Sequence, residues 1–273
     1  MGDAPPPGEA KLQVAQAFSR AAATYDQVIS FFAPFGRALA RAAALRPGER
    51  VLDVACGRGA SLYPALDAVR PGGSVVGIDL AHGMVEALTS QLLAAGVADA
   101  EVAKGDAEDL AVPDASFDAV LGGFMIFFAP DPPKVLAELH RVTRPGGRVA
   151  LSIFDGPPSW PWQGELVREL MGPPPARPSE EFNKAAVLVP ALEAAGFDAP
   201  TGNDVVERFV FESVESVEAW QRSHAGRLLL DGFDDLQMER YRALLAERLE
   251  DHRVAGGFEL VQRARMVVAV KPT

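Results

Sequence analysis

Apolar residues recur with two different spacings along the chain. Short apolar runs, typical of strands buried on both faces, alternate with segments of helical spacing at 62–69, 84–95 and about 133–142. The short runs are RVLDVA from Arg50, SVVGID from Ser74, AEVAKGD from Ala100, FDAVLGGF from Phe117 and GRVALSIF from Gly147. This alternation predicts an α/β fold with a doubly wound, mainly parallel sheet and helices on both faces.

The segments on either side of these runs complete the predicted organisation. Helical spacing within 11–45 predicts N-terminal helices ahead of a core at 49–154. A Pro-rich insertion with a helix then occupies 155–203, and 204–273 contributes the last two strands with a helical cap over 213–257. In this second half we expect helices over 163–171, 184–195 and 214–249, and strands VVERFVF (205–211) and RARMVVAV (263–270). These parts predict a single domain over 1–273.

Composition and charge narrow the class of partner. The apolar fraction is 48%, which is typical of a packed chain rather than a disordered one. Lys and Arg number 26 against 37 Asp and Glu, so the net charge is −11. A chain this acidic lacks the basic surface that grips phosphate backbones or anionic lipids. We therefore expect a small-molecule substrate, no nucleic acid and no membrane partner, and no sequence feature specifies an oligomeric state.

Cysteine and histidine usage predicts neither a disulfide framework nor a metal centre. Cys56 is the single cysteine, and the four histidines are too widely spaced to form a ligand pair such as HxxxH. No run approaches the roughly 20 apolar residues of a membrane helix, and the N-terminus lacks the basic and apolar pattern of a signal peptide. These features predict a reducing, cytoplasmic setting.

The segment VLDVACGRG from Val51 to Gly59 holds the most informative motif. A strand runs into a loop with Gly57 and Gly59 and then into a helix, a junction that brings backbone N–H groups against a ligand. A dinucleotide fingerprint requires a third small residue three positions after Gly59, where this chain has Leu62. Asp79 follows Gly59 by 20 positions, at the end of the next strand, where a carboxylate can accept both hydroxyls of a ribose. Taken alone, Asp79 could instead cap a helix, and Asp106 could be a turn residue.

Taken together, the ordered motifs resemble the class I S-adenosylmethionine-dependent methyltransferases. The similarity is to the small-molecule branch that resembles the quinone-biosynthesis (type 11) methyltransferases, and it is clear over about residues 20–155. The matching motifs are Tyr25-Asp26, Asp-x-Ala-x-Gly-x-Gly from Asp53, Asp79, Gly105 to Leu110, Phe117-Asp118, Asp131 and Arg144 to Gly147. The resemblance implies a Rossmann-like methyltransferase fold with a seven-stranded sheet, and S-adenosyl-L-methionine as cofactor.

The resemblance also implies roles for individual residues. The loop from Ala55 to Gly59 wraps the methionine end of the cofactor. Asp79, at the end of the next strand, binds the ribose hydroxyls, and Leu80 follows it in the binding set. Met84 packs on the adenine. Asp106 and the Ala107 amide read the adenine edge. The remaining members of the implied cofactor set are Tyr25, which closes over the cofactor, Cys56, Gly57 and Arg58 within the loop, and the Gly123 backbone. Cys56 itself is expected to be a small buried residue and no nucleophile.

Aromatic residues concentrate where the strands end, the edge at which open parallel sheets hold ligands. We expect about half of them to be core and the rest to form an acceptor pocket; the predicted pocket residues are Phe32, Phe124, Phe128, Phe154, Trp160 and Trp220. Phe127 and Phe128 stand where many relatives have a polar or histidine pair, which removes one usual acid or base. His224 is the remaining, weak candidate base for a hydroxyl acceptor, and a histidine at such a position is more often a surface helix residue.

The sequence therefore predicts an enzyme that transfers a methyl group from S-adenosylmethionine to a small, apolar or aromatic acceptor. Two alternatives remain open. One is a nicotinamide-dependent oxidoreductase, which Leu62 and the Gly105-Asp106-Ala107 motif disfavour. The other is a protein of the same fold that binds the cofactor without methylating, because fold and cofactor pocket do not determine the chemistry.

Overall fold

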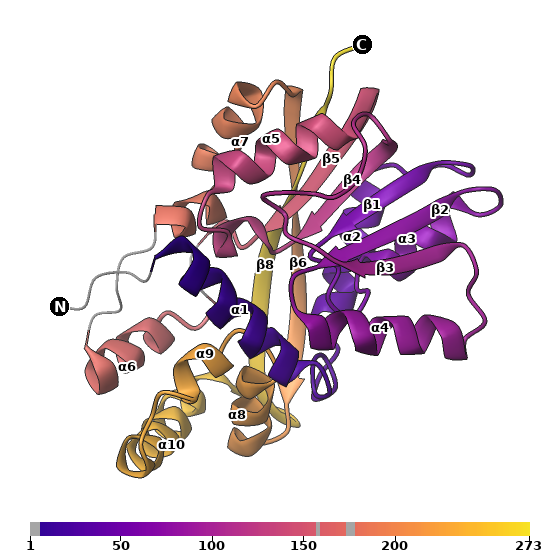
Figure 1. Ribbon diagram of the computed structural model, residues 1–273. Helices are drawn as coiled ribbons and strands as arrows, with labels where there is room; N and C mark the ends of the chain where they lie inside the picture. The colour runs from indigo at the N-terminus through magenta and orange to yellow at the C-terminus, as the bar shows by residue number, and fades with distance from the viewer. Residues whose placement is uncertain (1–5, 157–158, 173–177) are drawn as a thin grey trace.

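A mixed sheet flanked by helices forms the centre of the molecule (Figure 1). The computed structural model describes residues 6–156, 159–172 and 178–273. Within these residues the strand order is β3-β2-β1-β4-β5-β8-β6, and a two-residue strand, β7, pairs with β8. The strands are β1 (Arg50–Val54), β2 (Ser74–Asp79), β3 (Ala100–Lys104), β4 (Phe117–Gly123), β5 (Thr143–Ile153), β6 (Asp198–Phe211), β7 (Arg253–Val254) and β8 (Gly257–Val270).

The strand directions determine where a ligand can bind. Strands β1 to β5 are mutually parallel, and β8 lies antiparallel between β5 and β6. The chain moves outward from β1 through β2 to β3 and then returns to the other side of β1 with β4. Such a reversal opens a crevice at the carboxyl ends of the two central strands. The predicted doubly wound, mainly parallel α/β sheet is confirmed, with β7 as a small addition to the expected seven strands.

Both faces of the sheet are covered, which explains why the strands read as unbroken apolar runs. Successive residues of β1 point to opposite faces and join different cores: Val51 belongs to the core that includes residues of α2, α3 and α4, and Leu52 to that of α5 and α7. The covering helices are α2 (Phe32–Ala42), α3 (Leu62–Val69) and α4 (His82–Ala94) on one face, and α5 (Pro132–Val142) and α7 (Ala185–Ala194) on the other.

The helical cap gathers at one end of the sheet, at the bottom of Figure 1. It contains α6 (Trp162–Met171), α8 (Val214–Arg222), α9 (Arg227–Leu230) and α10 (Asp235–Leu249), and α1 (Pro7–Ala21) crosses beside it. Short 3-10 turns lie at Ile126–Phe128, Pro178–Asn183 and Glu250–His252. The single helical stretch expected over 214–249 is three helices, because capping boxes at Ser213 and Asp234 begin α8 and α10 separately.

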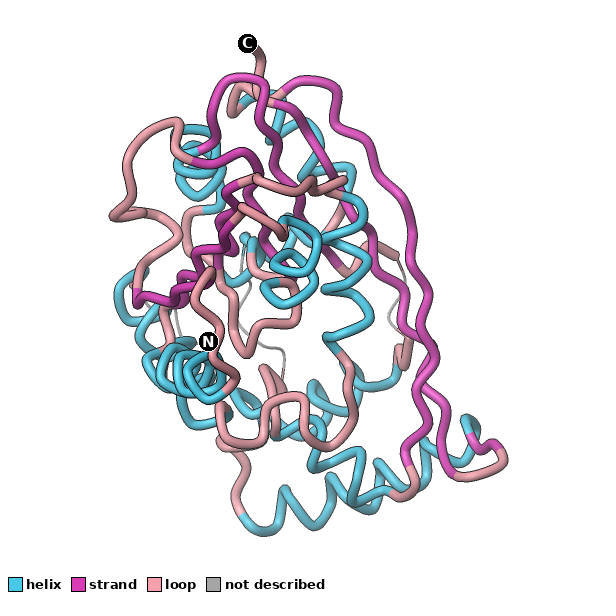
Figure 2. Tube along the Cα trace, turned by 90° about the vertical axis from the view of Figure 1, so that its right-hand side faces the viewer, coloured by secondary structure: helices cyan, strands magenta, loops and turns pink. Residues whose placement is uncertain are grey.

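Two strands are longer than the apolar pattern predicted. β6 begins at Asp198 rather than at Val205, and β8 begins at Gly257 rather than at Arg263. The added residues of β6 are largely exposed and polar, so hydrophobic alternation does not mark them, and their pairing with β8 decides their conformation. Figure 2 shows the two long strands running past the sheet to the cap helices. Residues 1–5, 157–158 and 173–177, and with them parts of the predicted insertion, lie outside the described residues.

Helix α2 packs closely at Gly36 on the turn between the glycine loop and α3. This glycine lies in α2 against the turn that follows the glycine loop, and a Cβ atom there would stand 2.0 Å from the Ala60 carbonyl oxygen. No side chain can be accommodated without moving α2 away from that turn.

We expect Gly36→Ala to lower the free energy of unfolding by about 2 kcal/mol or more, since the added methyl group meets backbone rather than a movable side chain. Gly164→Ala in α6 is the matched control. Its Cβ atom would lie 3.6 Å from an Arg168 nitrogen, an ordinary contact, so it should be neutral or stabilising. Chemical denaturation of both variants tests this packing, and equal effects would contradict it.

Candidate functional site

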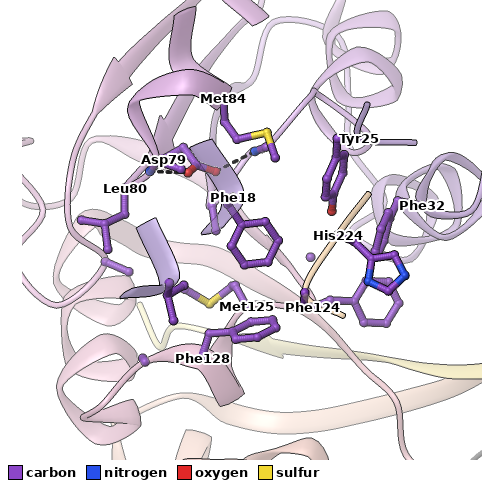
Figure 3. A pocket seen from close by; sticks show the side chains of 18 of the residues that line it. Phe18, Tyr25, Phe32, Asp79, Leu80, Met84, Phe124, Met125, Phe128 and His224 are labelled. Carbon is purple, nitrogen blue, oxygen red and sulfur yellow. Dashed lines mark hydrogen bonds between the residues drawn. The ribbon is translucent and has the colours of Figure 1, made fainter. Parts of the chain in front are cut away.

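A cavity of about 490 Å³ opens at the carboxyl ends of the parallel strands, at the switch point between β1 and β4. The loops after β1, β2, β3 and β4 line one part, α1 contributes Lys11 and Phe18, and the segment from Trp220 to Gly226 closes the far side. In Figure 3, side chains from these distant segments point into one space. Of the predicted cofactor residues, those that line the cavity are Tyr25, Ala55, Gly57, Asp79, Leu80, Met84, Asp106, Ala107 and Gly123.

The glycine loop presents only some of its residues to this cavity. At Gly57, with φ +52°, a Cβ atom would meet no atom within 4 Å, so the backbone there faces open space. Gly59 lines no part of the cavity: its φ is +85°, and a Cβ atom would meet the Tyr63 ring at 2.9 Å. The turn and the Tyr63 packing, rather than a ligand contact, account for that glycine.

Cys56 and Arg58 also lie outside the main cavity. They line a smaller hollow of about 40 Å³ that shares Tyr25, Ala55 and Gly123 with it. The Cys56 thiol is buried, and burial raises its pKa well above the usual range, which suits an inert packing residue. Arg58 donates a hydrogen bond to the Ala22 carbonyl oxygen and thereby anchors the end of the N-terminal segment.

Asp79 joins the end of β2 to the glycine loop. One carboxylate oxygen accepts a hydrogen bond from the Gly57 N–H and the other from the Ala81 N–H, both at 2.8 Å (dashed in Figure 3). The side chain is only 8% exposed, and burial raises the pKa of its carboxyl while these two hydrogen bonds oppose that rise. Each oxygen keeps lone-pair capacity for a further donor.

Asp106 is tied to α1 by an ion pair that the sequence did not reveal. Lys11 Nζ lies 2.6 Å from Asp106 Oδ2 and 2.7 Å from Glu108 Oε2, so the helix is held across the mouth of the cavity. Asp106 Oδ1 also accepts from the Glu108 N–H, which makes it a turn residue as well. Lys11 is separated from Asp106 by 95 positions, and only the helical spacing of α1 was visible in the sequence.

Two of the residues with a strained backbone lie at the strand ends that meet in the cavity. Ala55 after β1 and Phe124 after β4 both have a positive φ, at +58° and +51°, without being glycine. Such conformations cost of order 1 kcal/mol or more and cluster at functional sites. Here they turn the chain sharply out of the sheet, so that both residues line the cavity.

The far half of the cavity is aromatic. The Tyr25 ring stacks on Phe32 with centroids 5.1 Å apart, and Phe124 stacks on Phe154 at 4.1 Å. Five of the predicted acceptor-pocket residues line the cavity, namely Phe32, Phe124, Phe128, Phe154 and Trp220. Trp160 does not: it is fully buried between Trp162 and Phe211 and belongs to the core under the cap. Its indole N–H donates to the Glu259 carbonyl oxygen, a bond that holds the ring away from the ligand space.

His224 lines the cavity but does not have the properties of the base that the sequence suggested. Its Nδ1 accepts a hydrogen bond from the Gly226 N–H at 3.2 Å. Burial lowers the pKa of the imidazole to about 4, so it takes up a proton poorly near neutral pH. The geometry therefore argues against proton abstraction by His224.

Asp53 is a buried carboxyl that sequence reasoning used only as part of a motif. It lies in β1 with no exposed surface, and the Ser61 hydroxyl lies 2.9 Å from one carboxylate oxygen and 2.8 Å from the other. Burial raises its pKa to about 7; the Ser61 hydrogen bond opposes this rise and the charge of Asp79 adds to it. An acid inside the apolar run RVLDVA was the available signal.

Two kinds of feature are absent from the described residues. No three histidine, cysteine or acidic side chains among them come together as a metal site. None of the helices they form has the length and apolar character needed to cross a bilayer.

Comparison with known proteins identifies the core of the chain. Residues 52–151 match the family model described as a methyltransferase domain. The chain is 33% identical over 259 residues to nocamycin O-methyltransferase of Saccharothrix syringae, covering 88% of this chain and 91% of that protein.

Other relatives match the core alone. Aklanonic acid methyltransferase DauC of Streptomyces sp. is 41% identical over 143 residues, covering 52% of this chain and 65% of that protein. Demethylmenaquinone methyltransferase of Symbiobacterium thermophilum is 35% identical over 150 residues, covering 53% of this chain and 60% of that protein. Among solved structures, the YcgJ protein of Bacillus subtilis has a TM-score of 0.61 at 18% identity, covering 88% of this chain and 99% of that one, a likeness of fold.

The raised pKa of Asp53 predicts a pH-dependent stability. The folded state keeps this proton up to about pH 7, whereas the unfolded chain loses it near its ordinary value of 3.8. The stabilisation from Asp53 is therefore complete below about pH 4 and is lost as the pH rises through 7. Relative to Asp53→Asn, the unfolding free energy of the wild type should fall by up to about 1.4 kcal/mol per pH unit between pH 5 and 7. Urea denaturation of both ligand-free proteins measures this, and parallel pH profiles would show that Asp53 titrates normally.

Proposed function

The chain belongs to the class I S-adenosylmethionine-dependent methyltransferases, and from this premise we propose that the aromatic half of its cavity binds a small, planar, apolar acceptor. S-adenosylmethionine supplies an electrophilic methyl group on its sulfonium. The proposal rests on the aromatic lining of the cavity, which begins beside the glycine loop and Gly123.

The cofactor side of the cavity fits the adenosyl group in chemistry and shape. Gly57 and Gly123 leave their backbones open, since no atom would lie closer than 3.9 Å to a Cβ atom at either position. We assign the methionine end to the loop from Ala55 to Gly57, the ribose hydroxyls to the Asp79 carboxylate, and the adenine edge to Asp106 and the Ala107 amide. Two lining residues complete the assignment: Met84 packs on the base, and Tyr25 closes over the cofactor from the N-terminal segment.

The acceptor side offers no free cationic side chain to a phosphate or carboxylate group among the described lining residues. Lys11 is the one lysine or arginine among the described lining residues, and Asp106 and Glu108 already neutralise it. A phosphate or carboxylate group would therefore lose its hydration without gaining a cationic partner. Stacked rings such as Phe124 and Phe154 instead favour a planar apolar acceptor.

This arrangement promotes methyl transfer by aligning the acceptor with the methyl group and by excluding water from the cavity. An in-line attack on a sulfonium methyl group disperses positive charge, so alignment and exclusion of water can supply much of the rate. Because His224 is a weak base, the acceptor hydroxyl group must lose its proton without help from this side chain. Acceptors with an acidic hydroxyl group, such as electron-poor phenols and enolised 1,3-dicarbonyl compounds, suit the site best.

The names of the relatives specify nocamycin, aklanonic acid and demethylmenaquinone, which supports a small-molecule acceptor and a role in small-molecule biosynthesis. We also propose a cytoplasmic location, because the single cysteine of the chain, Cys56, is a buried free thiol.

We expect the purified enzyme to methylate members of a panel of acidic phenols and polyketide-like enols, and to leave aliphatic amines and phosphorylated alcohols unmodified. Mass spectrometry of the product and of S-adenosylhomocysteine measures turnover. Turnover restricted to the charged acceptors would contradict the aromatic-pocket proposal. Cofactor binding without any S-adenosylhomocysteine formation would favour a non-methylating role.

Asp79→Ala should weaken S-adenosylhomocysteine binding by roughly 2 to 4 kcal/mol, because two hydroxyl donors lose a charged acceptor. The same change leaves the Gly57 and Ala81 N–H groups without their acceptor, so Asp79→Asn, which keeps one carbonyl oxygen, is the milder companion. Calorimetric titration, with a melting curve for each ligand-free variant, separates binding from stability. Wild-type affinity in a folded Asp79→Ala protein would remove the ribose role.

A further inference from the structure

Two buried N–H groups in the aromatic half of the cavity lack a hydrogen-bond partner. Trp220 Nε1 and His224 Nε2 are the buried side-chain nitrogen or oxygen atoms without a partner among the described residues. Both residues line the cavity, and their ring centroids lie 4.6 Å apart. Because buried polar groups in folded proteins are nearly always paired, two adjoining exceptions in one ligand cavity point to a ligand atom.

The protonation of His224 follows from its other ring nitrogen. The Gly226 N–H donates to Nδ1, so Nδ1 carries a lone pair and the proton of the neutral ring resides on Nε2. The low pKa that burial produces keeps the ring neutral. An indole nitrogen is a donor only, so both groups offer hydrogen and neither offers a lone pair.

The neighbouring side chains provide no acceptor for these two donors. Around His224 stand the rings of Phe31 and Phe32, with centroids 6.5 and 6.1 Å away, besides Trp220 itself. The other two tryptophans of the cap show the contrast. Trp160 donates to the Glu259 carbonyl oxygen and Trp162 donates to His252 Nε2. Trp220 is thus the tryptophan whose donor is left for the cavity.

We propose that the N–H groups of His224 and Trp220 bind a hydrogen-bond-accepting oxygen of the methyl acceptor, either a carbonyl oxygen or an ionised hydroxyl group. This inference rests on the proposed function and specifies its substrate class. His224 is then a positioning and specificity residue that donates to the substrate. An acceptor without an oxygen at this end would leave both donors unpaired, and sites of that kind reject such analogues strongly.

The hydrogen bonds to this oxygen would determine the orientation of a planar acceptor at one end. The donors lie on the cap side of the cavity, whereas Gly57 and Gly123 lie on the sheet side. In this proposal the bound oxygen lies at the cap end of the acceptor, and the atom that receives the methyl group lies at the sheet end.

The test uses a matched pair of probes, 1-tetralone and tetralin, which share a bicyclic skeleton and differ in one carbonyl oxygen. With S-adenosylhomocysteine present, we expect the wild type to bind 1-tetralone at least about fivefold more tightly than tetralin, the worth of one hydrogen bond. His224→Phe should abolish this preference. His224→Gln, whose amide nitrogen can replace Nε2 as donor, should retain it, and Trp220→Phe should reduce it. Melting curves confirm that each variant is folded.

A second measurement is independent of any acceptor. Nitrogen-15 NMR of histidine-labelled protein, with the resonance assigned by its loss in His224→Phe, should show a neutral ring protonated on Nε2 at pH 7. Protonation on Nδ1, or an imidazolium, would overturn the inference. So would equal binding of the two probes, or an undiminished preference in His224→Phe. Failure of both probes to bind would instead count against the proposed aromatic-acceptor function.

Discussion

The hydrogen bonds of the Asp79 carboxylate hold together the part of the molecule that can act on a ligand. One oxygen binds the Gly57 N–H after β1, and the other binds the Ala81 N–H ahead of α4. Two neighbouring strand ends and the glycine loop are thereby kept in a single arrangement. The cost is a carboxyl group almost entirely removed from water, which only close donors can offset. A ligand that donates further hydrogen bonds to Asp79 would stabilise its buried carboxylate without rearranging the loops around it.

The enclosure around this site comes from the two ends of the chain. Lys11 ties α1 to Asp106 and Glu108, while the long arms of β6 and β8 carry the cap helices to the opposite side. The cofactor loops therefore belong to the rigid sheet, and the walls that exclude water belong to the added segments. Helix α1 is held over the cavity by these ion pairs and by its buried residues Ala17 and Ala21.

This division separates two kinds of specificity. In the proposed arrangement, backbone groups and carboxylates at the strand ends bind the polar cofactor. Aromatic rings from α1, α8 and the loops after β4 and β5 line the proposed acceptor space. Two N–H donors within those rings, on Trp220 and His224, add a polar requirement to a largely apolar surface. A variable cap on a constant sheet allows one fold to serve many acceptors.

The sheet and the loops at its ligand-binding edge could be predicted from the amino-acid sequence. The predicted strand from Ser74 to Asp79 and the predicted helix from Leu62 to Val69 have the observed bounds, because both are buried and their apolar spacing records the faces that are covered. The glycine loop after β1 and the position of Asp79 at the next strand end could be predicted equally well, since a loop between two adjacent elements is a local feature.

Which side chains face the cavity depends on the folded arrangement of distant segments. Trp160 and Trp220 have the same chemistry, yet one donates to the Glu259 carbonyl oxygen in the core and the other reaches the ligand space. The protonated nitrogen of His224 depends on the position of the Gly226 N–H, and the partner of Lys11 lies on another strand end. The spacing of apolar residues indicates that a residue is buried. The identity of the residues that contact it depends on segments far apart in the chain, and no local pattern encodes those contacts.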